Sequence, residues 1–259
     1  MFEEIPVNIR FHYHNILSLI MVGVWVYFGY RAFTIKDNKY RYKLSIYLII
    51  FCLFQELIDF INRIFLDPVY LFSIQRDLPF IQFCQISFYF ALFCMYVTKD
   101  KTNYHSYSLK HFLFDCSFLL GFSGAFQAIL TPDFHNINNL LGVICIQFQH
   151  SLIILSLIWL MIGYGYRLQF KGLCYTYLMI NLIVPFALLI NNYLGVNSAG
   201  EIANYFYVSE LPTVDNYFLN LISQHPSPDY ILYMQPIIIC YFLLLYLPFI
   251  FINNYERDN

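Results

Sequence analysis

The sequence has little charge. Only 12% of its 259 residues are Asp, Glu, Lys or Arg, which is about half the share of a soluble domain, while 59% are hydrophobic and the mean hydropathy is +0.57. This composition excludes a soluble globular domain and predicts a polytopic membrane protein. The net charge of −2 leaves no basic surface, so we expect no nucleic-acid partner.

Paired cysteine motifs are also missing. The seven cysteines lie in apolar stretches without a C-x-x-C pair: Cys52, Cys84, Cys94, Cys116, Cys145, Cys174 and Cys240. The pattern indicates neither a disulfide framework nor a zinc site, and we expect no metal and no cofactor. The acidic start of the chain lacks the basic region and cleavage signature of a signal peptide, so we expect the first apolar run to remain as a spanning helix. No internal repeat is visible, which disfavours an inverted-repeat transporter.

Apolar runs of roughly 20 residues, the length that crosses a bilayer, recur along the chain. They predict an all-α protein, a single domain over residues 1–259 with seven transmembrane helices. The spans are expected near 13–33, 44–64, 79–98, 112–130, 140–163, 173–193 and 231–252. The long outer loop, 194–230, contains an apolar and polar mixture at 217–222 that suggests a short interfacial helix.

Lys and Arg gather in alternate connections. The first, third and fifth connections carry them, as at Lys36, Lys101 and Arg167, whereas the other connections hold few. The positive-inside rule therefore predicts a multi-pass protein of the cell membrane with its N-terminus outside and its C-terminus inside.

Polar side chains inside the spans are the strongest functional signal, because they are costly in hydrocarbon. In the second span, the spacing of Glu56, Asp59 and Arg63 places them on one helix face and predicts an Asp59–Arg63 ion pair. Helix–helix contact alone is the alternative, but two carboxylates with one Arg leave an excess negative charge. The fifth span carries Gln147 and His150. A metal site that combines His150 with His12 and His14 is a weaker alternative, because His-x-His spacing is common by chance.

The third span opens with a thiol between two glutamines. These residues are Gln82, Cys84 and Gln85. A rise of about 1.5 Å per residue places Cys84 and His150 in the outer half of the membrane at depths that are compatible with one pocket. Pro79 is expected in the first turn of this helix, which puts Cys84 beyond the turn where the helix dipole favours a thiolate.

A reactive Cys84 therefore needs a neighbouring base, and His150 is the candidate inside the membrane. We expect Glu56 and Asp59 to orient its imidazole. Gln82 or Gln85 would then donate to an oxyanion.

Several motifs carry a family resemblance that spans most of the chain. Residues 78–84 resemble the leucine-proline-x-histidine-x-cysteine segment of the YwaF-like bacterial integral membrane family, and residues 128–133, 148–150 and 204–207 match further motifs in the same order. That family is similar to a vertebrate membrane acyltransferase that remodels ether phospholipids, and more distantly to the androgen-induced-gene hydrolases of fatty-acid esters. The resemblance implies a Cys or Thr nucleophile paired with a His, which here gives Cys84 and His150.

The resemblance also implies supporting roles for Asn204 and Tyr205. This sequence departs from the family pattern at Gln82, where the family has histidine, and by one extra residue before Cys84.

Together these observations predict an acyltransferase or ester hydrolase of the outer leaflet. Cys84 would attack an acyl ester of a phospholipid while His150 accepts its proton, and the acyl chain would pass to a lysolipid, a lipoprotein amine or water. A receptor or transporter that binds a small molecule at Glu56, Asp59 and Arg63 is the alternative from another class. A purely structural membrane partner is a third, and the cost of its buried charges disfavours it.

Overall fold

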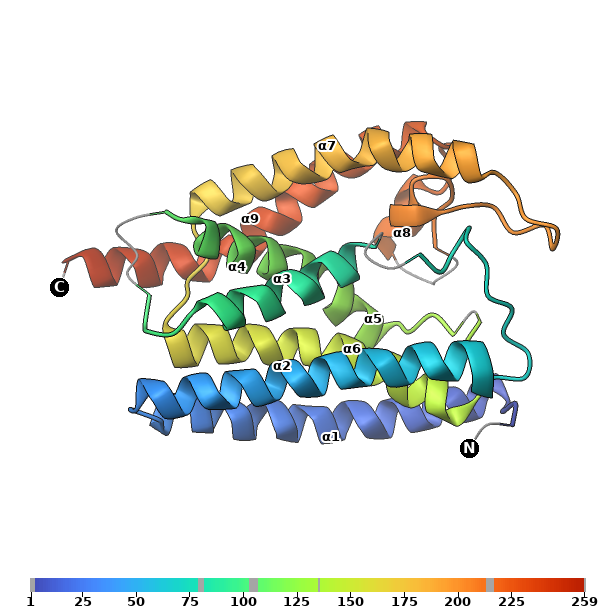
Figure 1. Ribbon diagram of the computed structural model, residues 1–259. Coiled ribbons are helices and arrows are strands. Elements are labelled where there is room, and N and C mark those ends of the chain that lie inside the picture. Colours follow the sequence, from blue (N-terminus) through green and yellow to red (C-terminus); the bar gives the residue numbers. More distant parts are fainter. Residues whose placement is uncertain (1–2, 79–81, 103–106, 135, 213–216, 259) are drawn as a thin grey trace.

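A computed structural model describes residues 3–78, 82–102, 107–134, 136–212 and 217–258 (Figure 1). Within these residues the fold is all-α, and its β-structure is limited to two isolated bridges, Glu4 with Asn139 and Val196 with Ile202. The long helices run side by side along one axis, and the two termini lie at opposite ends of the bundle (Figure 1).

The described helices agree with most of the predicted spans. They are α1 Val7–Thr34, α2 Asn38–Ile61, α3 Phe83–Val97, α4 Leu109–Leu120, α5 Phe126–Leu130, α6 Leu140–Ile158, α7 Phe170–Leu194, α8 Tyr217–Ile222 and α9 Asp229–Asp258. Six segments in the described chain are long and apolar enough to cross a membrane: 7–34, 38–66, 109–130, 140–163, 170–194 and 230–252. The short helix expected at 217–222 is confirmed as α8. The count of seven spans and the side on which each terminus lies stay predictions.

The third predicted span, 79–98, differs most from the structure. Here α3 has 15 residues and begins at Phe83, after Gln82, whose backbone is extended at φ −142° and ψ 147°. Pro79, which was expected in its first turn, lies outside the described residues. The expectation that Cys84 lies beyond the first turn is therefore wrong, because Cys84 is the second residue of α3.

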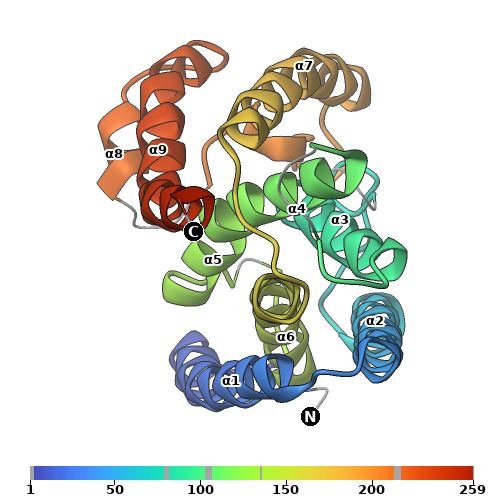
Figure 2. The same ribbon diagram turned by 90° about the vertical axis from the view of Figure 1, so that its left-hand side faces the viewer.

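The bundle is organised around α6. Viewed along the axis, α6 lies near the centre, with α1 and α2 on one side and α3, α4 and α5 on the other, while α7 and α9 form the far side (Figure 2). The segments that contain α4 and α6 bury most of their residues, whereas α1, α2, α7 and α9 expose many large apolar side chains. Such exposure is typical of helix faces that contact lipid.

Three π-helical turns lie within or at the ends of these helices. They are η1 Asn62–Leu66 after α2, η2 Gly121–Ala125 between α4 and α5, and η3 Trp159–Gly163 after α6. The helices approach closely at Gly121, because a Cβ there would lie 2.9 Å from Ile153 and from the Ser87 hydroxyl. Single π-helical turns are frequent at functional sites, and the first two lie beside the cavity described next.

Candidate functional site

A cavity of about 570 Å³ lies beside the N-terminal end of α3. One part of its wall, from α2, η1 and the connection to α3, is polar and includes Asp59, Arg63, Tyr70, Arg76 and Asp77. Another part, from α4, α7 and α9, is apolar and includes Leu120, Ile180, Met234, Ile238 and Phe242. A cavity with these two kinds of wall suits a ligand that has a polar group and a long apolar chain.

Cys84 and His150 both line this cavity. The sulfur of Cys84 faces the backbone of η2, since a Cβ added to Gly124 would lie 2.7 Å from Cys84 Sγ. His150 comes from α6, is 8% exposed, and its Nδ1 has no hydrogen-bond partner in the described part of the chain. The structure thus brings a thiol and a buried imidazole to the wall of one cavity.

The first turn of α3 adds backbone donors next to the thiol. The first hydrogen bond of the helix runs from the Ile86 N–H to the Gln82 carbonyl at 3.0 Å. The N–H groups of Cys84 and Gln85 precede it, and neither has an acceptor among the described residues. The N–H groups of a first helical turn and the positive end of the helix dipole favour negative charge at this point.

The carboxylates of α2 take different places. The expected ion pair between Asp59 and Arg63 is confirmed, and Arg63 Nη1 also lies 3.9 Å from Asp77 Oδ1. Glu56 is outside the cavity wall, where it accepts a hydrogen bond of 2.6 Å from Gln149 Nε2. In the described chain neither Glu56 nor Asp59 is hydrogen-bonded to His150, so the arrangement offers no carboxylate that orients this imidazole directly.

The three glutamines predicted for the site do not all line the cavity. Gln82 and Gln85 line the cavity, whereas Gln147 is fully buried outside its wall and donates to Ser151 Oγ at 3.1 Å. Gln82 Oε1 accepts the Phe206 N–H at 3.2 Å, which ties the start of α3 to the long loop after α7. Gln85 Oε1 is buried without a partner among the described residues.

Asn204 and Tyr205 lie in the scaffold around the cavity and do not line it. The Asn204 side chain donates to the Glu210 carbonyl at 2.9 Å and so closes its own loop. The Tyr205 hydroxyl donates to the Ile74 carbonyl at 2.6 Å and accepts the Leu78 N–H at 2.9 Å. The contacts of Tyr205 hold the loop after α7 and the α2–α3 connection together.

Tyr207, two residues further on, is the member of this motif that lines the cavity. It belongs to η4 Tyr205–Tyr207, in which Phe206 and Tyr207 have φ angles of 57° and 53°. Such left-handed geometry is uncommon for residues other than glycine. The family motif pointed to this segment. Because so short a segment has no helical or strand periodicity, the sequence could not show which of its side chains faces the cavity.

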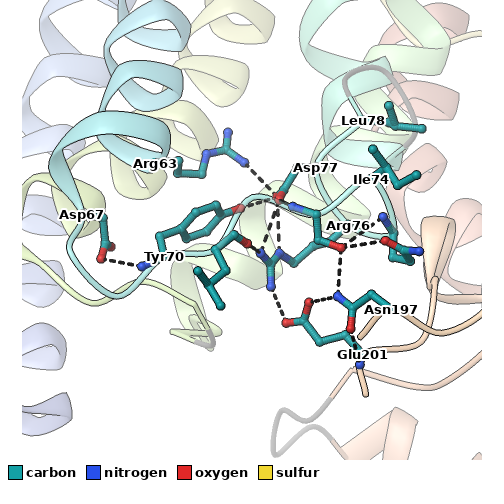
Figure 3. A network of polar contacts seen from close by, with 12 residues as sticks. Arg63, Asp67, Tyr70, Ile74, Arg76, Asp77, Leu78, Asn197 and Glu201 are labelled. Atoms are coloured by element: carbon teal, nitrogen blue, oxygen red, sulfur yellow. Dashed lines mark hydrogen bonds and ion pairs between the residues drawn. The ribbon is translucent and has the colours of Figure 1, made fainter. Parts of the chain in front are cut away.

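A polar network joins the α2–α3 connection to the loop after α7 beside the cavity (Figure 3). Asp77 accepts hydrogen bonds from the Tyr70 hydroxyl and from the Ser73 N–H, the latter at 2.8 Å. Arg76 Nη1 pairs with Glu201 Oε1 at 2.5 Å, which links the α2–α3 connection to the hairpin after α7. Burial, together with the bond to Asp77, raises the pKa of Tyr70 to about 12, so its hydroxyl remains a donor at neutral pH.

Asp115 is a buried acid that the sequence reasoning missed. It is fully buried on α4, outside the cavity wall, and its carboxylate fits against Gly172 of α7, where any Cβ would overlap it. The sequence could have indicated it, because Asp115 is the only charged residue in the predicted span 112–130.

The histidines of the alternative metal site, His12, His14 and His150, do not form a metal centre in the described chain. His14 Nε2 lies 3.0 Å from the Ile129 carbonyl, which occupies that nitrogen. No group of three or more His, Cys, Asp or Glu residues is placed to hold a metal ion in the described part of the chain.

A comparison with known protein families assigns most of the chain to one family. The TMEM164 family model matches residues 10–246, a range that contains every residue of the cavity wall. Neither a curated protein nor a solved structure matches the chain. With several apolar helices long enough to cross a bilayer and a family match over most of its length, this multi-pass membrane protein belongs to the TMEM164 family.

Proposed function

We propose that the protein is a membrane acyltransferase or ester hydrolase that moves the acyl chain of a phospholipid through a thioester at Cys84. The observation that carries this proposal is that Cys84 and His150 line one cavity with both polar and apolar walls. A thiol with a nearby base is the minimum for nucleophilic acyl transfer, and free backbone donors next to the sulfur add to it.

The reaction needs two transfers. In the first, His150 takes the thiol proton while Cys84 Sγ attacks the carbonyl carbon of the ester. The tetrahedral intermediate then expels the lysolipid oxygen, which receives the proton from His150. In the second, His150 takes a proton from the acceptor, which attacks the thioester carbonyl and releases Cys84. The acceptor is a lysolipid, a lipoprotein amine or water.

The cavity walls suit a phospholipid substrate in the outer leaflet of the cell membrane. Its acyl chain would lie against the apolar residues of α4, α7 and α9, such as Leu120 and Phe242. Its head group would lie at the end that Arg63 and Asp77 line. The ester between these parts then comes to the middle of the molecule, where α3 supplies Cys84.

The receptor or transporter alternative has less support. It requires charged groups that are ready to bind a ligand, but Asp59, Arg63, Arg76, Asp77 and Glu201 already pair with one another. A ligand that binds there has to displace these ion pairs. Ligand uptake without acyl turnover would favour this alternative.

The test is to incubate the purified protein in lipid nanodiscs with phosphatidylcholine and to measure the intact mass. We expect a mass increase of one acyl chain that is lost in Cys84→Ser. It should be much reduced in His150→Ala. Cys174→Ser is the matched control, because Cys174 is an exposed thiol on α7 outside the cavity wall. Turnover that survives Cys84→Ser would refute the proposal, and the products distinguish transfer to a lysolipid from release of a free fatty acid.

The orientation is tested on the same residue. In intact cells, a membrane-impermeant thiol reagent added outside should label wild-type protein more than Cys84→Ser. Labelling of Cys84 only from the cytoplasmic face would reverse the proposed orientation.

A further inference from the structure

Tyr207 and Cys84 line the wall of one cavity although 123 positions separate them in the sequence. The segments that carry them are in contact, because the rings of Phe83 and Phe206, the residues next to Cys84 and Tyr207, pack edge to face with centroids 4.7 Å apart. Cys84 comes from the membrane helix α3, whereas Tyr207 comes from the long outer loop. The loop thus supplies a hydroxyl to the reactive end of the helix.

The backbone at Tyr207 is held in an unusual conformation by contacts on both sides. Phe206 and Tyr207 are consecutive non-glycine residues with positive φ angles, a geometry that persists only where the surroundings fix it. The Tyr230 hydroxyl donates to the Tyr207 carbonyl at 2.5 Å, and the Phe206 N–H donates to Gln82 Oε1 at 3.2 Å. The second bond joins the strained turn to the residue that precedes α3.

The phenol of Tyr207 is a hydrogen-bond donor under physiological conditions. Although 44% of the residue is exposed, partial burial raises the pKa of Tyr207 to about 12, and the neighbouring Cys84 and Asp133 add to this shift. At neutral pH the hydroxyl therefore keeps its proton.

Two further observations mark where a substrate oxygen would lie. The N–H groups of Cys84 and Gln85 have no acceptor in the described part of the chain. On the same cavity wall, His150 is more than nine-tenths buried and its Nδ1 has no partner among the described residues. Unpaired polar groups in one buried site indicate that a ligand completes their hydrogen bonding.

We propose that Tyr207 is a catalytic residue whose hydroxyl donates a hydrogen bond to the acyl carbonyl oxygen as Cys84 attacks, together with the N–H groups in the first turn of α3. This inference rests on the proposed function. When the carbon–sulfur bond forms, the electron pair of the carbonyl double bond moves to its oxygen, and Tyr207 stabilises that negative charge without giving up its proton. When the ester bond breaks, the pair returns to the carbonyl and the lysolipid oxygen leaves with the proton held by His150.

The test compares Tyr207→Phe with Tyr193→Phe in nanodiscs that contain phosphatidylcholine. Tyr193 is the matched control, because it is 90% exposed at the end of α7 and outside the cavity wall. Two rates are measured at Cys84: formation of the acyl thioester in a single turnover, and alkylation by iodoacetamide. Alkylation forms no oxyanion, so it reports thiol reactivity and local folding alone.

We expect Tyr207→Phe to slow thioester formation by roughly 10²-fold, the effect of removing one oxyanion donor, while alkylation proceeds at the wild-type rate. Thioester formation at the wild-type rate would overturn the proposal. An equal loss of both rates would also overturn it, because it would show that Tyr207 only holds the structure. The proposed function fails separately, if Cys84→Ser retains turnover.

Discussion

Gly124→Ala tests the geometry on which the site depends. The added Cβ would lie 2.7 Å from Cys84 Sγ, whereas ordinary contacts between such atoms are about 3.5–4.0 Å. The sulfur and the η2 backbone therefore have to separate by about 1 Å, either through a new rotamer of Cys84 or through movement of α3 away from η2.

The expected loss of stability follows from two opposing effects. Overpacking costs about 1–3 kcal/mol, and replacing glycine by alanine in a helix returns about 0.5–1 kcal/mol. The net destabilisation is then about 0–2.5 kcal/mol, which lowers the thermal unfolding midpoint of a chain of this size by up to about 10 °C. Because the displaced atom is the proposed nucleophile, acyl turnover should fall by up to about 10²-fold.

The assay combines thermal unfolding in detergent with acyl turnover, and it has two controls. Gly23→Ala in α1 is the matched substitution, because its Cβ meets no atom within 4 Å, and it should leave both measurements at or slightly above wild type. Cys84→Ala removes the sulfur, so Gly124→Ala should cost no stability in that background. If Gly124→Ala costs the same with and without Cys84→Ala, the sulfur does not lie against Gly124 and the reasoning is refuted.

Three further predictions concern the rest of the bundle. Gly172→Ala should lower the unfolding midpoint sharply, because its Cβ overlaps the Asp115 carboxylate, and adding Asp115→Ala should restore part of the loss. Arg76→Ala should cost no more than about 1 kcal/mol but should speed proteolysis near Glu201, since it removes their ion pair. The pKa of Tyr70 is about 12 in the folded chain and about 10 in the unfolded chain, so its titration should lower the free energy of unfolding by about 2 kcal/mol from pH 10 to 12, and Tyr70→Phe should remove that part of the fall.

Apolar run length predicted most of the helices, but it could not find the start of α3. The run from Leu78 to Phe93 is apolar throughout apart from a few polar side chains, so no composition change marks a boundary. The structure begins the helix at Phe83, where Gln82 Oε1 accepts the Phe206 N–H from a loop far away in sequence. A tertiary contact of this kind leaves no local pattern to read.

The polar residues show the same division between local and tertiary effects. The pair Asp59–Arg63 was predictable, because residues four apart on one helix face must meet. Glu56 lies on the same helix, but its partner Gln149 comes from α6, and helix spacing alone could not identify it. Asp115 could have been found by its charge in an apolar span, whereas its fit against Gly172 required the packing of α4 on α7.

The N-terminal end of α3 depends on the loop after α7 as much as on the long helices of the bundle. Gly124 leaves room for the Cys84 sulfur, but Gln82 and its bond to Phe206 fix where the helix begins, and hence which N–H groups stay free beside that sulfur. The same turn of the loop presents Tyr207 to the cavity. Because one loop sets both the helix start and the hydroxyl, a change in that turn should alter the reactivity of Cys84 even though the chain positions are far apart.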